Sequence, residues 1–220
     1  MHKKTPRPRL FVQKPGPNSA VLNWHNGSDV EIRLYARSLQ NAAKTLVAKL
    51  EPDRSARTDW DGCPVVLLYR EALELHLKAL VGEGSSFLKT RTDPISLSRT
   101  HSLRWLAQIV CQIIKAVKWE SDFTCEGVAS LADFSAVVNE VEALDPVTRA
   151  IRSSGAGGKS SVSQYYRTFN VVQFTRRMDA LLDLLDVTAD ALAATWDHRA
   201  ECMAAEANLY TRGDFEPTVQ

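Results

Sequence analysis

The pattern of apolar and polar positions predicts a chain built almost entirely of helices. The segment from about residue 64 to 84 is apolar on nearly every side. Its few charges share one narrow stripe: Arg70, Glu71, Glu74 and Lys78. A helix with so little polar surface lies in the middle of a bundle. We therefore expect the other helices to cover this central helix.

Four further segments carry apolar residues at the steps of three and four that are typical of amphipathic helices. They cover about residues 29–51, 103–117, 131–144 and 166–208. The segment 29–51 starts with a pattern that caps helix N-termini, Ser28-Asp29-Val30-Glu31. Its apolar face is predicted to comprise Tyr35, Leu39, Ala42, Ala43, Leu46 and Leu50. The expected fold class is all-α, a bundle of about five helices with a long C-terminal helix.

The length of 220 residues fits one large domain. Residues 1–27 are rich in proline and positive charge and are interpreted as an extended basic arm. Residues 28–210 are expected to form a single helical bundle domain, and residues 211–220 a polar tail.

Composition narrows the function classes. The net charge of +1 gives no indication of a nucleic-acid or membrane partner. No apolar run approaches the ~20 residues that span a bilayer, and the N-terminus lacks the apolar core of a secretory signal. The four cysteines show no metal-ligand spacing: Cys63, Cys111, Cys125 and Cys202. We expect reduced thiols, a cytoplasmic location, no metal site and no cofactor.

Two motifs carry a resemblance to a known family. The run Tyr69-Arg70-Glu71-Ala72-Leu73-Glu74-Leu75-His76-Leu77-Lys78-Ala79-Leu80, followed by Thr100-His101-Ser102-Leu103, resembles the HEPN superfamily of prokaryotic helical bundles. The stretch Asp145-Pro146-Val147-Thr148-Arg149-Ala150-Ile151-Arg152 continues the likeness. The resemblance implies an HEPN-like binding or regulatory module in a toxin–antitoxin or phage-defence system. The partners it implies are RNA or a protein encoded beside it, such as a nucleotidyltransferase.

An alternative is a metal-independent HEPN ribonuclease, since enzymes of that group use an Arg-x(4–6)-His motif. Only Arg70 and His76 match it here. Six positions place them about 120° apart on an ideal helix, so they would flank a groove rather than stack. In the competing interpretation Arg70 joins a ladder with Glu74 and Lys78, and His76 packs at the edge of the core. We favour the second interpretation and leave enzymatic activity open.

Candidate binding residues lie in two places. His101 is either a general base or a structural tie between its loop and the central helix. A basic cluster surrounds residues 153–163, with Tyr165 and Tyr166 interleaved: Arg149, Arg152, Lys159, Arg167, Arg176 and Arg177. Basic and aromatic side chains together either bind the phosphates and bases of RNA or form a solvent-exposed surface with no ligand. We also hypothesise that His76, His101 and Arg152 line one cleft.

Residues 153–160 nearly match a nucleotide-binding P-loop, but no buried strand precedes them, and a flexible loop is the favoured interpretation. The last helix suggests a third function, a structural interaction subunit. Its apolar line runs to Leu192 and Trp196, past the part that a short bundle would bury. We therefore expect a homodimer or a docked partner there, unless the helix breaks near Thr188.

Overall fold

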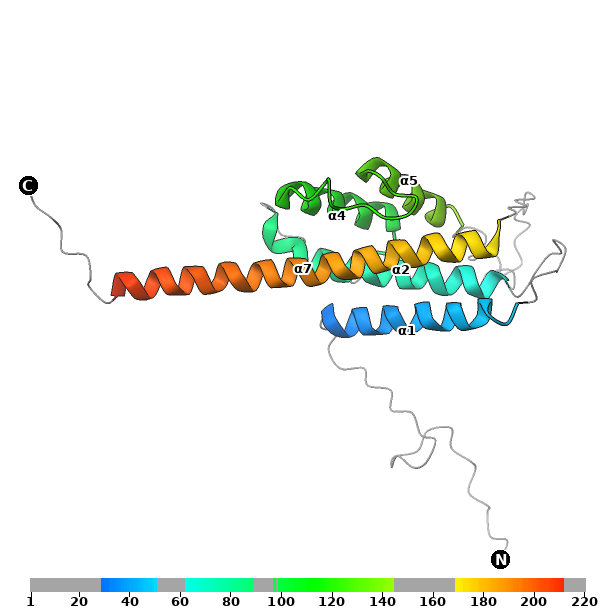
Figure 1. The fold of residues 1–220 in the computed structure, drawn as a ribbon, viewed down its shortest axis with the longest axis horizontal. Coiled ribbons are helices and arrows are strands. Elements are labelled where there is room, and N and C mark those ends of the chain that lie inside the picture. Colours follow the sequence, from blue (N-terminus) through cyan, green and yellow to red (C-terminus); the bar gives the residue numbers. More distant parts are fainter. Residues whose placement is uncertain (1–28, 51–61, 89–96, 98, 145–168, 212–220) are drawn as a thin grey trace, which may run out of the picture.

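In a computed structural model of the chain, residues 29–50, 62–88, 97, 99–144 and 169–211 are described (Figure 1). Five α-helices occur among them: α1 Asp29–Val47, α2 Gly62–Gly84, α4 Leu103–Val117, α5 Leu131–Glu142 and α7 Val171–Thr211. A short 3₁₀ turn, η1 Ser85–Phe87, follows α2. The described part contains no strand, so the predicted all-α class with a long C-terminal helix is confirmed.

Helix α2 is the centre of the bundle, as its nearly continuous apolar surface predicts. It packs against α1, α7 and α4. Figure 1 shows α1, α2 and α7 side by side, with α1 antiparallel to the other two, and α4 and α5 stacked along one side. A Cβ on Gly84 would lie 2.6 Å from the side chain of Ile113, so glycine is required where α2 approaches α4.

The ends of α4 are fixed by local hydrogen bonds. The hydroxyl of Ser102 accepts from the main-chain N–H of Trp105 and donates to Glu142 of α5. The other oxygen of Glu142 accepts from the main-chain N–H of Arg104. These bonds satisfy N–H groups that a helix start leaves without partners, and they also join α4 to α5. The helix ends at Val117, and Lys118 after it adopts a left-handed backbone with φ 62° and donates its N–H to the carbonyls of Ile114 and Lys115.

Helix α7 is continuous through Thr188, so the hypothesised break there is wrong. It starts at Val171 instead of near residue 166, because the side chain of Asn170 caps it by accepting from the N–H of Gln173. Its 41 residues extend about 60 Å at ~1.5 Å per residue. Figure 1 shows its C-terminal part running well past the other helices. Leu192 is nevertheless buried, so the core continues further along α7 than predicted.

The predicted apolar face of α1 is partly wrong. Three of its residues are exposed, Tyr35, Ala42 and Leu46, whereas Leu39 is half-buried and packs against the core. The buried side of α1 instead combines the small residues Ala36 and Ala43 with Arg33 and Gln40. The reason is that α7, which α1 packs against, presents aspartates toward it, so polar side chains of α1 turn inward.

Candidate functional site

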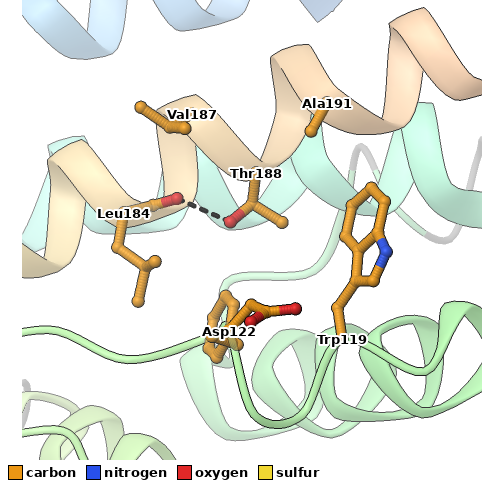
Figure 2. Close-up of a pocket in the computed structure, with 7 residues that line it drawn as sticks. Trp119, Asp122, Leu184, Val187, Thr188 and Ala191 are labelled. Carbon is orange, nitrogen blue, oxygen red and sulfur yellow. Dashed lines mark hydrogen bonds between the residues drawn. The ribbon is translucent and has the colours of Figure 1, made fainter.

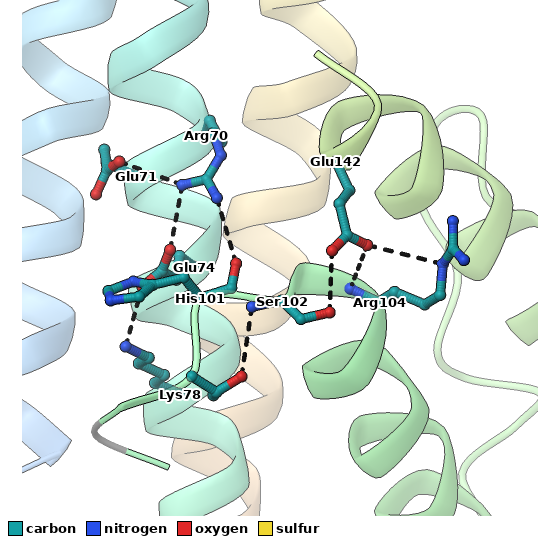
Figure 3. Close-up of polar contacts among 9 residues, drawn as sticks. Arg70, Glu71, Glu74, Lys78, His101, Ser102, Arg104 and Glu142 are labelled. Atoms are coloured by element: carbon teal, nitrogen blue, oxygen red, sulfur yellow. Dashed lines mark hydrogen bonds and ion pairs between the residues drawn. The ribbon is translucent and has the colours of Figure 1, made fainter. Parts of the chain in front are cut away.

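The first member of the ribonuclease motif, Arg70, is buried and neutralised. Its side chain is only 4% exposed. Nη1 lies 3.1 Å from Oε2 of Glu74 and 3.2 Å from Oε1 of Glu71, and Nη2 donates to the main-chain carbonyl of His101 (Figure 3). Two carboxylates and a carbonyl of the same chain bind this guanidinium, so it is not available to bind a phosphate.

Glu74 is the centre of this group. Its other oxygen, Oε1, lies 3.0 Å from Nζ of Lys78 and 2.8 Å from Nδ1 of His101. Burial alone would raise the pKa of the Glu74 carboxyl, but hydrogen bonds from Lys78 and His101 hold that pKa below its ordinary value. We call these residues the Glu74 network: Arg70, Glu71, Glu74, Lys78 and His101. The predicted ladder and the structural tie through His101 are both present.

The second member, His76, lies on another side of α2 and deeper than predicted. It is 1% exposed, so it belongs to the core and not to its edge. Its Nδ1 lies 4.0 Å from Oδ1 of Asp186 in α7. Neither ring nitrogen has a hydrogen-bond partner among the described residues, and burial lowers the pKa of His76 to about 4. The imidazole is therefore neutral near neutral pH.

These positions separate residues that the sequence analysis placed together. Arg70 turns toward the loop of His101, whereas His76 turns toward α7. The hypothesis that His76 and His101 line one cleft is unsupported by any contact between them in the described part. Arg152, the third member, lies outside the described residues.

The side of α2 that holds His76 borders a long row of charged and polar side chains between α1 and α7. Helix α1 contributes Arg33, Arg37, Gln40 and Lys44. Helix α7 contributes Asp179, Asp183, Asp186 and Asp190. We call these eight residues the α1–α7 charge stripe. The contacts between the two helices run antiparallel, from Arg33 with Asp190 to Lys44 with Asp179 at 3.4 Å.

Contacts within the stripe are dense. Nε of Arg37 donates to Asp186 at 2.7 Å, and the amide of Gln40 donates to Asp179 at 3.0 Å and Asp183 at 3.2 Å. Tyr69 of α2 adds its hydroxyl to Asp179 at 2.9 Å. Burial and this hydrogen bond to a carboxylate raise the Tyr69 pKa, which keeps the phenol protonated. The stripe thus fixes α1, α2 and α7 in register.

Sequence reasoning missed this stripe, although a signal for it was present. The four α1 positions follow one another at steps of four, three and four residues, and so do the four aspartates of α7. Matching steps of basic or amide side chains on one helix and aspartates on another indicate that the two helices pair along one seam.

The predicted basic binding cluster is only partly within the described residues. Arg149, Arg152, Lys159 and Arg167 lie outside them, as does the P-loop-like segment 153–160. Arg176 forms an ion pair with Glu126. The side chain of Arg177 lies beside Gly127, within 3.6 Å of where a Cβ would stand. The two described members therefore border the turn after α4.

The side of α7 that borders the turn after α4 carries a half-buried to exposed row of small and medium apolar residues at steps of four and three: Ala180, Leu184, Val187, Ala191 and Ala194. Val187 is 66% exposed. Beside it, Trp119 and Phe123 complete a shallow groove of about 260 Å³ (Figure 2). The hydroxyl of Thr188 donates to the carbonyl of Leu184 at 2.7 Å, so the groove wall is apolar in effect. Asp122 is its one charged lining residue.

No group of three or more His, Cys, Asp or Glu side chains in the described part is arranged to hold a metal ion. Within the same residues, no helix is both long and apolar enough to cross a membrane. Comparison with protein-family models, with curated proteins and with solved structures found no match.

Proposed function

We propose that this protein is an HEPN-like, cytoplasmic binding and regulatory module whose ligand is another protein chain that docks along α7. The supporting observation is the partly exposed apolar row of α7 that borders the groove beside Trp119, in which Val187 is 66% exposed. Steps of four and three residues form the seam by which one helix packs on another. A partner helix laid along α7 would cover Val187 and fill the groove beside Trp119.

The chemistry of the groove specifies the partner. Its lining is apolar apart from Asp122, so an amphipathic helix with one basic residue facing Asp122 fits it best. The resemblance suggests the product of a neighbouring gene, for example a nucleotidyltransferase. Arg176 already pairs with Glu126, which makes the described face a weaker support for RNA.

The burial of Arg70 and His76 favours a binding role over ribonuclease activity. Proton transfer in RNA cleavage requires a side chain within hydrogen-bond reach of the ribose. His76 is 1% exposed and enclosed between α2 and α7, which leaves no such reach in this structure.

The test is reconstitution with the purified product of the adjacent gene, measured by calorimetry. Replacing Val187 with Glu places a charge in the seam, and we expect it to weaken binding at least about ten-fold, or 1.4 kcal/mol. Val172→Glu is the matched control, because Val172 is equally exposed on α7 but outside the seam. Equal losses in both variants would contradict the proposal.

A second titration, with fluorescent single-stranded RNA, distinguishes RNA binding from the binding of a protein partner. RNA binding that survives Val187→Glu, falls as salt rises and is lost in Arg176→Ala would contradict a protein partner on α7 and favour RNA.

A further inference from the structure

A buried carboxylate holds the exposed imidazole of His101 in one orientation. Nδ1 of His101 lies 2.8 Å from Oε1 of Glu74, and the side chain of His101 is 66% exposed whereas that of Glu74 is 4% exposed. The main chain of His101 is also fixed, because Nη2 of Arg70 donates to its carbonyl (Figure 3). The ring is therefore anchored at one nitrogen and meets solvent on its other side.

The contact with Glu74 determines which ring nitrogen carries the hydrogen when the imidazole is neutral. Burial acts to raise the pKa of the Glu74 carboxyl, but hydrogen bonds from Lys78 and His101 hold that pKa below its ordinary value. The ionised Oε1 therefore accepts, and Nδ1 carries the hydrogen. Nε2 then carries the lone pair, and it has no hydrogen-bond partner among the described residues. A carboxylate behind one ring nitrogen makes the opposite nitrogen more basic and activates it as a nucleophile.

The charges near His101 favour an anionic reagent over a cation. Cationic side chains outnumber carboxylates in the Glu74 network, the loop before α4 and the first turn of α4: Arg70, Lys78, Arg99 and Arg104 against Glu71, Glu74 and Glu142. The two carboxylates that flank the loop, those of Glu74 and Glu142, are already occupied by hydrogen bonds. Arg99, two residues before His101, is exposed.

We propose that His101 is a nucleophilic site that accepts a phosphoryl group on Nε2. The lone pair of Nε2 attacks the phosphorus of a phosphoryl donor and forms an N–P bond. The bond from phosphorus to the leaving group breaks, and the leaving group keeps its electron pair. The ring gains positive charge in this step, and the carboxylate of Glu74, which still accepts from Nδ1, compensates that charge. The site lies away from the groove of α7, so it is independent of the partner proposed there.

Phosphoramidate, a small phosphoryl donor whose leaving group is ammonia, tests the proposal on the full chain. We expect His101 to be phosphorylated at least about ten-fold faster than N-acetylhistidine in the same solution, because Glu74 activates its ring. Phosphorus-31 nuclear magnetic resonance follows the acid-labile product, and mass spectrometry of peptides from the wild type identifies the residue. Nitrogen-15 labelling of the histidines shows which ring nitrogen carries the phosphorus.

Two matched variants complete the experiment. His101→Asn places an amide donor where Nδ1 stood, so the hydrogen bond to Glu74 is kept while Nε2 is lost, and the fast phosphorylation should disappear. His198→Asn removes another exposed histidine, on α7, and should leave the fast phosphorylation unchanged. Circular dichroism verifies that both variants are folded.

Three results would overturn the proposal. One is phosphorylation of His101 in the wild type that is no faster than that of N-acetylhistidine. Another is phosphorus on Nδ1, which would show that Glu74 does not hold that nitrogen. The third is a fast phosphorylation that persists in His101→Asn or is lost in His198→Asn.

Discussion

Two polar groups on different sides of α2 solve the problem of buried charge differently. In the Glu74 network, both oxygens of one carboxylate are engaged, by Arg70 on one side and by Lys78 and His101 on the other. In the α1–α7 charge stripe, Oδ1 of Asp186 and both nitrogens of the adjacent His76 lack hydrogen bonds among the described residues. The first group satisfies its central carboxylate with hydrogen bonds, whereas the second borders a neutral imidazole that has no hydrogen bond among the described residues.

This difference divides the ribonuclease-like motif between two structural tasks. Arg70 belongs to the network that attaches the loop before α4, and His76 belongs to the packing of α2 on α7. A pair of residues at motif spacing does not form a site when a helix turns them toward different neighbours. The central claim of this account is that both residues serve the fold.

The largest effect is expected in the Glu74 network. Glu74→Gln keeps the shape of the side chain but leaves Arg70 and Lys78 without their shared carboxylate. Removing one partner of a buried ion pair costs about 3–5 kcal/mol. We expect a loss of this size in the free energy of unfolding, measured by urea denaturation near neutral pH.

An exposed pair gives the control for that experiment. Glu126→Gln removes the partner of Arg176, which is well exposed on the surface. Such pairs contribute about 0–1 kcal/mol. If Glu74→Gln lowers stability no more than Glu126→Gln does, the Glu74 network is not the buried anchor described above.

Replacements of His76 should separate packing from polarity. His76→Ala removes buried volume and should lower the free energy of unfolding by about 1–3 kcal/mol. His76→Leu fills the same space without ring nitrogens that lack hydrogen bonds, so we expect it to raise that free energy by about 1 kcal/mol near neutral pH. Thermal and urea denaturation check both values, and a leucine variant as unstable as the alanine variant would show that the imidazole makes a favourable polar contact.

The two groups should also respond to acid in different pH ranges. The pKa of His76 falls from 6.5 to about 4 on folding, so the unfolded chain binds more protons between these values. Stability is therefore fully present above about 6.5 and falls as the pH drops toward 4, by at most ~1.4 kcal/mol per pH unit for one proton. Unfolding curves across this range should show the slope in the wild type and a smaller one in His76→Leu.

Glu74 acts at lower pH. Because its folded pKa is below 4.5, its contribution is present above that value and is lost only as the pH falls through the lower folded pKa. A stability profile that is flat between 6.5 and 4.5 in the wild type would contradict the assignment of His76, while a loss confined to still lower pH would be the signature of Glu74.

The sequence predicts α2 and α4 well because each has a clear apolar pattern and a local start signal. Ser102 caps α4, and α4 covers the predicted range, Leu103–Val117. Helix α1 was misjudged because its interior side is decided by α7, more than a hundred residues away. Arg33 and Gln40 are buried there, and Tyr35 is exposed, since the aspartates of α7 compensate the polar side chains of α1.

The candidate site could be predicted only where local spacing decides it. The contacts of Arg70 and Lys78 with Glu74 follow directly from steps of four residues on one helix. The burial of His76 against Asp186 could not be read from α2 alone, because it depends on the register of α2 against α7. The row around Val187 was not predicted from the sequence either, because the predicted apolar line of α7 describes the side of the helix that faces the core.

The most direct test of the central claim is the titration of the His76 imidazole by nuclear magnetic resonance, with its signals assigned by their loss in His76→Leu. The account predicts that the ring stays neutral as the pH is lowered and becomes protonated only at about 4, where the buried side chain is forced to take up charge. A His76 ring that titrates near the ordinary value of 6.5 would show that it meets solvent, and this result would contradict the claim that His76 belongs to the core.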